Sequence, residues 1–185
     1  MYKKVFSLIL VAILLSCQRE YTPKPRGFFR INLPEKEYTK SPDILPYKFE
    51  IAKNSIITKN HKEQGWINIE YPQYKATIYL SYKKIHNNLE TYINDSREFA
   101  YKHTIKADAI LEDVFINKDK KVYGIKYDIQ GDAASNTQFF LTDSTVNFLR
   151  GSLYFNVIPN KDSLAPVLSY INKDIVHIIE TFEWK

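Results

Sequence analysis

The only cysteine of the chain closes an apolar run near its start. A basic pair of residues precedes Val5–Leu15, in which Ser7 is the one polar residue, and the run ends in Leu14-Leu15-Ser16-Cys17. It is shorter than the roughly 20 apolar residues that a transmembrane helix needs, but it suits the apolar part of a secretory signal. An aliphatic residue three positions before the cysteine and a small residue directly before it are typical of bacterial lipoprotein signals.

That motif implies a defined chemistry, in which Leu14, Ser16 and Cys17 form the recognition site of the signal peptidase. The thiol of Cys17 receives diacylglycerol as a thioether, the chain is cleaved before it, and the freed amine takes a fatty acid such as palmitate. Each buried CH₂ contributes about 0.8 kcal/mol, so two or three acyl chains hold a domain on a bilayer almost permanently. We therefore expect residues 1–16 to be a signal peptide. The alternative is an unlipidated signal peptide with an incidental cysteine.

Other chemistry is sparse in this sequence. An acylated Cys17 leaves no thiol for a disulfide, a nucleophile or a metal site. No serine-nucleophile or phosphate-loop motif occurs, and no histidine pair has metal-ligand spacing among His61, His86, His103 and His177. We expect a protein that is not an enzyme and that holds no metal and no cofactor.

Three polar features have a structural explanation that we prefer. Glu112 and Asp113 are neighbours on an expected strand, so their carboxylates should point to opposite faces and cannot share one proton-transfer step. His103 lies on the apolar side of an expected helix and is predicted to be a core residue. The small, polar loop Gly131–Asn136 is predicted to be a plain strand connection, although it could border a pocket.

Residues 17–46 differ in composition from the rest, because prolines recur through them and exclude long helices and central strands. We expect a lipid anchor followed by an extended linker. Within it, arginines alternate with aromatic residues more specifically than a tether requires. The candidate docking residues are Pro23, Pro25, Arg26, Gly27, Phe29 and Arg30. A partner protein could bind Arg26–Ile31, named here the docking strip; equally, the strip could pack on the flank of its own domain.

The segment Tyr21–Ile31, followed by Leu33-Pro34-Glu35-Lys36 directly behind the lipoprotein motif, resembles the gliding motility lipoprotein family GldD of the Bacteroidetes. A tyrosine is common in that family where this chain has Phe28. The resemblance implies a role in the gliding machinery and in the associated type IX secretion system. It implies no catalytic residues, because none are established for the family.

The hydrophobic pattern of residues 47–185 predicts one α+β domain. Helices are expected at Leu89–His103, with a capping start at Asn87, and at Ser163–Phe182, with Ser163 as the cap. Gly151 is expected to mark a bulge. The expected strands are Tyr47–Ile51, Trp66–Tyr71, Ala76–Tyr82, Leu111–Asn117, Tyr123–Ile129, Thr137–Leu141 and Val146–Val157. Trp66–Tyr71 and Ala76–Tyr82 are expected to form a hairpin with the apolar residues of each strand on one face. The last helix is expected to carry an apolar stripe at three- and four-residue spacing. This order predicts an antiparallel sheet with two main helices packed on it, and it resembles the PsbP/Mog1-like fold.

The function that these features favour is that of a lipid-anchored envelope protein working through protein–protein contacts. A formal net charge of +5 over 185 residues is too mild for a nucleic-acid binder. The alternative is a small-ligand-binding or chaperone-like lipoprotein with a PsbP-like domain; a hydrolase is the least favoured class. The expected partners are a membrane, through Cys17, and other gliding or secretion proteins. Because Gln18-Arg19-Glu20 is not an acidic cluster, we expect an outer-membrane lipoprotein that faces the periplasm.

Overall fold

The computed structural model describes residues 31–59 and 63–185. The residues from Ile31 to Lys185 form one compact unit. Its elements, in chain order, are β1 (Tyr38–Lys40), β2 (Tyr47–Lys48), β3 (Glu50–Ala52), β4 (Ile56–Lys59), β5 (Ile67–Tyr71), the short 3₁₀ helix η1 (Pro72–Tyr74), β6 (Ala76–Lys84), α2 (Leu89–Tyr101), β7 (Ala107–Asn117), β8 (Val122–Gly131), β9 (Thr137–Thr142), β10 (Asn147–Phe155), α3 (Lys161–Thr181) and β11 (Glu183–Trp184).

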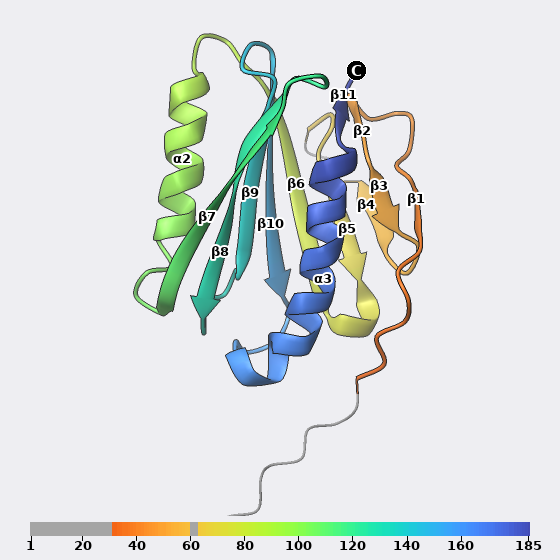
Figure 1. Cartoon of the computed structure of the whole chain (residues 1–185), viewed down its shortest axis with the longest axis vertical. Coiled ribbons are helices and arrows are strands. Elements are labelled where there is room, and N and C mark those ends of the chain that lie inside the picture. Colours follow the sequence, from red (N-terminus) through yellow and green to blue (C-terminus); the bar gives the residue numbers. More distant parts are fainter. Residues whose placement is uncertain (1–30, 60–62) are drawn as a thin grey trace, which may run out of the picture. The chain divides into compact units, whose positions relative to one another are not determined.

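The unit is organised around a seven-stranded sheet in the order β4-β5-β6-β10-β9-β8-β7. All neighbouring strands of this sheet are antiparallel. After β6 the chain crosses through α2 to the far edge at β7, and it returns strand by strand until β10 pairs with β6 (Figure 1). The predicted α+β class, an antiparallel sheet with two main helices, is confirmed.

The predicted hairpins are confirmed together with the faces of their strands. In the hairpin of β5 and β6, Ile69 lies opposite Ile78. Burial alternates along both strands, with the apolar residues on one face. Period-two alternation places such residues on one side of a pleated strand, so the face that enters the core was predictable. The short strands β1, β4 and β11 were not predicted.

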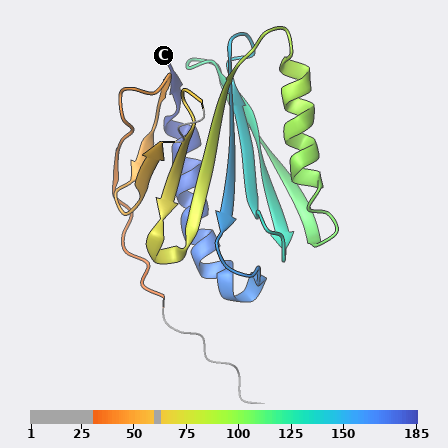
Figure 2. The same ribbon diagram turned by 180° about the vertical axis from the view of Figure 1, so that it is seen from behind.

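Helix α3 covers one face of the sheet and encloses the larger core. Ile171 and Ile175 are both 0% exposed and pack with buried residues of the sheet strands. The aromatic side chains of Tyr47 and Phe182 close the end of this core, with ring centroids 5.4 Å apart. Figure 2, seen from behind, shows the strands β6 and β10 in front of α3. The apolar stripe predicted for the last helix is therefore its core face.

Helix α2 packs on the opposite face and encloses a smaller core. This second cluster includes Tyr127, Ile129, Phe140 and Phe148. The rings of Phe140 and Phe148 are stacked, with their centroids 5.5 Å apart. These residues come from β8, β9 and β10. On the neighbouring strand β6, Tyr79 is 44% exposed, so α2 covers only part of this face.

The predicted bulge at Gly151 is wrong. Gly151 pairs in regular register with Leu80 on one side and Phe139 on the other. A Cβ at this position would lie 2.2 Å from the ring of Phe139, so glycine makes room for that ring. An irregularity lies instead in β7, between Ala107 and Ala109.

The cap of each helix differs from the predicted one. The final helix begins at Lys161, and the cap is Asn160, whose Oδ1 accepts the backbone N–H of Ser163 at 3.0 Å. Asparagine and serine are both good caps, and the polar run before the helix offers either. Helix α2 starts at Leu89 after Asn88, which makes no side-chain cap bond.

Residues 31–46, named here the leader segment, pack with the rest of the described chain. Strand β1 pairs with β3, with Thr39 opposite Ile51, and Leu45 is 6% exposed within the larger core. The sequence assigned these residues to the linker; in the structure they are part of the compact unit. The proposed signal peptide and residues 17–30 of the linker lie outside the described residues, so the division of the chain there stays a prediction.

Candidate functional site

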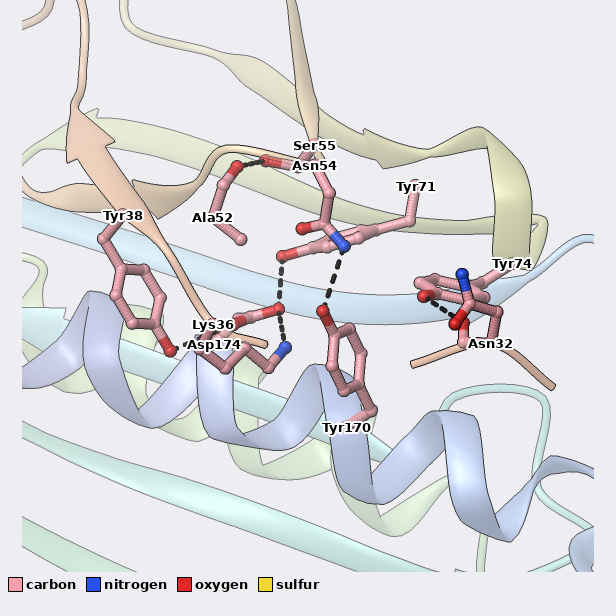
Figure 3. Close-up of polar contacts among 10 residues, drawn as sticks. All are labelled: Asn32, Lys36, Tyr38, Ala52, Asn54, Ser55, Tyr71, Tyr74, Tyr170 and Asp174. Atoms are coloured by element: carbon pink, nitrogen blue, oxygen red, sulfur yellow. Dashed lines mark hydrogen bonds and ion pairs between the residues drawn. The ribbon is translucent and has the colours of Figure 1, made fainter. Parts of the chain in front are cut away.

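The polar group that joins the leader segment to α3 centres on a buried carboxylate. The side chain of Asp174 is 0% exposed. Its Oδ2 accepts hydrogen bonds from Lys36 Nζ at 2.7 Å and from the Tyr71 hydroxyl at 3.1 Å. Its Oδ1 accepts one from the Tyr38 hydroxyl at 3.2 Å. Figure 3 shows these side chains converging on Asp174. With Tyr170 they are named here the Asp174 cluster.

The ammonium group of Lys36 is held by charge and by an aromatic face together. Its Nζ lies 3.0 Å from the centroid of the Tyr170 ring, in a cation–π contact. The Lys36 side chain is 18% exposed. Burial lowers the pKa of Lys36 from its ordinary value, while the hydrogen bond to Asp174 acts in the opposite direction. The pair is therefore a largely desolvated ion pair, which the neighbouring hydroxyl groups complete.

The tyrosine hydroxyls of the cluster are fixed as donors. Burial and the adjacent charge of Asp174 raise the pKa of Tyr38 to about 12. The same two causes raise the pKa of Tyr71 further above its ordinary value. Both phenols are therefore protonated at neutral pH and donate to the carboxylate. The cluster has a closed set of donors and acceptors supplied by the chain itself.

A second layer of contacts extends the cluster along the leader segment. The ring of Tyr38 stacks on His177 with centroids 3.6 Å apart, and His177 Nε2 lies 2.9 Å from Glu50 Oε2. His177 of α3 is thus partly enclosed. At the other end, the hydroxyl of Tyr74 donates to the carbonyl oxygen of Asn32 at 2.9 Å.

The cluster can hold the leader segment on α3. Lys36 and Asp174 are 138 residues apart in the sequence, so their contact fixes two distant parts of the chain to each other. Donor groups of the chain itself already bind the carboxylate oxygens of Asp174. This arrangement suits a structural contact between the leader segment and α3 better than proton transfer to a substrate. The docking strip ends at Ile31, directly before the first of these attachments at Asn32. The leader segment that follows the strip in the chain is therefore fixed on the domain at Asn32, Lys36 and Tyr38.

We expect Lys36→Met to lower the free energy of unfolding by about 3 kcal/mol, because it leaves Asp174 buried without a counter-charge. Urea unfolding of the purified protein measures this. The double variant Lys36→Met/Asp174→Leu should recover part of the loss, although the Tyr71 hydroxyl then lacks its acceptor.

The matched control is Lys53→Met, which removes an ion pair with Glu37 that is exposed on both sides. It should change the stability little, since solvent screens such pairs. Equal effects of Lys36→Met and Lys53→Met would contradict the role assigned to the cluster.

The residues predicted to carry the site lie outside the described part of the chain. They are Leu14, Ser16, Cys17, Pro23, Pro25, Arg26, Gly27, Phe29 and Arg30. Lipidation and docking at these positions stay predictions. Sequence reasoning missed Asp174, although one signal could have found it. Asp174 lies three residues after Ile171 and four before Ile178, inside the apolar stripe, and a charge at such a position requires a buried partner.

The other residues singled out from the sequence do not form a reaction centre together. Asp113 pairs with Lys126 at 2.9 Å, whereas Glu112 accepts a hydrogen bond from Tyr101, so the two carboxylates point to opposite faces as predicted. His103 is partly exposed and follows the end of α2. In residues 31–59 and 63–185, no group of three or more His, Cys, Asp or Glu is placed to hold a metal ion.

The polar loop after β8 does border a pocket, which is the less favoured of the two interpretations. An open cavity of about 350 Å³ lies against the N-terminal half of α3, and its lining includes Gly131, Ala133 and Asn136. Asn136 is buried there, and its Nδ2 donates to the carbonyl oxygens of Ile129 and Gly131. The side chain that holds the loop together thus also shapes the cavity wall.

No helix of the described residues is long and apolar enough to span a bilayer.

Comparison with protein families gives a match over nearly the whole chain. The family model described as gliding motility lipoprotein GldD matches residues 18–184. This range covers the docking strip, the leader segment and all of the described domain except Lys185. A search of curated proteins gave no match.

Proposed function

The chain belongs to the GldD family of gliding motility lipoproteins, and on that premise we propose that it is a non-catalytic, membrane-anchored subunit that acts through protein–protein contacts. The observation that carries the proposal is the attachment of the leader segment to α3 through Asp174. This attachment fixes Lys36 and Tyr38, which follow the docking strip in the chain, on the folded domain.

The proposed place of action is the periplasmic side of the outer membrane, with the lipid of Cys17 as the anchor. The proposed machinery includes the type IX secretion system that accompanies gliding. Two features support this assignment: the lipoprotein motif before residue 18, and the absence of an acidic cluster in Gln18-Arg19-Glu20. The family supports a lipoprotein of the cell envelope.

Replacing Arg26–Arg30 with Gly and Ser residues of equal number tests the docking role. Arginine and aromatic side chains dominate interface energetics, and single truncations can cost about 2 kcal/mol or more. We expect a membrane-bound protein at normal abundance in cells that spread poorly and secrete less. Colony spreading, secreted protein in the medium and immunoblots of membranes measure these outcomes.

The conservative variant Phe28→Tyr is the matched control, because it keeps an aromatic ring at the same position of the strip. It should leave spreading unchanged. Lower abundance of the Gly/Ser variant would indicate that the strip packs on its own domain. Normal spreading at normal abundance would show that the strip is only a tether.

A further inference from the structure

A second pocket lies on the other face of the sheet, between α2 and the strands that α2 leaves uncovered. Its volume is about 230 Å³. The helix contributes Tyr92, Asp95, Ser96 and Phe99; the strands and the residue before β5 contribute Trp66, Ser81, Lys83, Phe148 and Arg150. This wall combines aromatic side chains with two cations, and none of these residues belongs to the Asp174 cluster.

Arg150 is the unusual member of this pocket. Its Nη2 donates to Gln138 Oε1 at 2.5 Å. Its Nε is buried and has no hydrogen-bond partner among residues 31–59 and 63–185, and neither has Nε2 of Gln138. No carboxylate of the described residues forms an ion pair with Arg150, whereas Arg97 lies 3.9 Å from Glu112. A guanidinium carries five N–H donors and keeps its charge. Arg150 therefore has hydrogen-bonding capacity that the described residues do not use.

The surroundings of Arg150 favour an anion that carries an apolar body. The guanidinium carbon lies 4.7 Å from the centroid of Phe99, which covers one face of the charged group. The ammonium of Lys83 lies 4.9 Å from the centroid of Tyr92 at another wall of the pocket. Bound apolar groups could pack on the same rings, because the pocket is lined mainly by carbon.

The charges facing the pocket add up to one positive charge. Lys83 and Arg150 are cationic, and Asp95 of α2 is the one carboxylate among the described residues that line the pocket. Tyr154 of β10 and His103 after α2 lie near Arg150 as well. Burial, followed by the charge of Arg150, lowers the pKa of His103, so His103 is neutral at pH 7. A monoanion would balance this set of charges, and a dianion would exceed it.

We propose that this pocket, named here the Arg150 pocket, binds a small carboxylic acid with an aromatic or short aliphatic body. The carboxylate accepts hydrogen bonds from the guanidinium of Arg150, a planar donor that matches carboxylate geometry. The body lies among Tyr92, Phe99 and Phe148. This site is independent of the docking strip and of the proposed role in gliding.

Phenylacetate is the probe, and its neutral and cationic analogues phenylacetamide and phenethylamine are the ligand controls. With the full-length lipoprotein in a non-ionic detergent, we expect phenylacetate to raise the melting temperature and to move the Nε–H resonance of Arg150. Ligands that bind only the folded state stabilise it in this way. Phenethylamine should do neither, and phenylacetamide should act more weakly than phenylacetate.

Two variants test whether phenylacetate binds in the Arg150 pocket. Arg150→Met should weaken phenylacetate binding at least tenfold. Lys83→Gln should weaken it several-fold, and this exposed position keeps the fold intact if Arg150→Met destabilises it. Lys84→Gln is the matched control, because Lys84 is the exposed neighbour in β6 that points to the opposite face. It should bind phenylacetate like the unmodified protein.

Three outcomes would overturn the proposal. They are no movement of the Arg150 resonance at saturating phenylacetate, an equal response to phenethylamine, and equal losses in the Lys83 and Lys84 variants. The first means that phenylacetate does not bind at the guanidinium of Arg150, and the other two mean that the probe binds without the charges of the pocket.

Discussion

Ile175→Asp should unfold the domain or destabilise it by several kcal/mol. Ile175 is 0% exposed in α3 and packs in the larger core with residues of the sheet. A carboxylate there has no partner and must be desolvated or protonated, which is among the costliest single changes in a protein core. Thermal unfolding followed by circular dichroism measures the effect.

A graded series separates the two contributions to this loss. Ile175→Val should cost about 1 kcal/mol, and Ile175→Ala about 2–5 kcal/mol, because they remove packing without adding charge. Ile105→Asp makes the same chemical change at a side chain that is 93% exposed, and it should leave the melting temperature unchanged. A normal melting temperature for Ile175→Asp would show that this face of α3 is not in the core.

Cys17→Ser should release the protein from membranes completely. The serine cannot form the thioether to diacylglycerol, so the acyl chains that provide the membrane affinity are never attached. We expect no incorporation of labelled palmitate, and we expect the chain to leave the membrane fraction after a high-salt wash. Gliding should fail with it, because the family is one of lipoproteins.

Ser16→Ala is the control for this experiment, since it keeps a small residue before the cysteine and should be processed normally. Protease added to intact cells tests the proposed orientation in the same fractions, because a periplasmic domain stays intact. A Cys17→Ser protein that remains on membranes in high salt and still takes up label would contradict the lipoprotein assignment.

The spacing of apolar residues was sufficient to predict the elements that show a clear period. The alternation in Ile67–Tyr71 and Ala76–Tyr82 predicted a hairpin and its core face, and both are confirmed. The three- and four-residue spacing of the last helix predicted its buried stripe. In both cases the period of the apolar residues matches the geometry of a single element, so no distant partner is needed.

The short strands lie beyond that kind of reasoning. β1 has three residues and is paired with β3, and β11 has two and is paired with β2. Segments of this length are too short to show a period, and a partner strand supplied by another part of the chain makes them strands. Gly151 was misjudged for the same reason, because the ring that occupies the space above it belongs to Phe139 of the neighbouring strand.

The sequence by itself therefore determined the α+β class, the faces of its main elements and the resemblance to the family that the chain matches. The anchor chemistry at Cys17 also comes from the sequence alone, and it stays a prediction. Only the tertiary structure decided which polar residues meet. Lys36 reaches Asp174 across 138 residues of chain, and Arg150 lies in a pocket beside Phe99, without an ion pair to any carboxylate in the described part of the chain. The physical reason is that a period records which side of an element is buried, whereas the partner of a buried charge is set by how distant elements pack together.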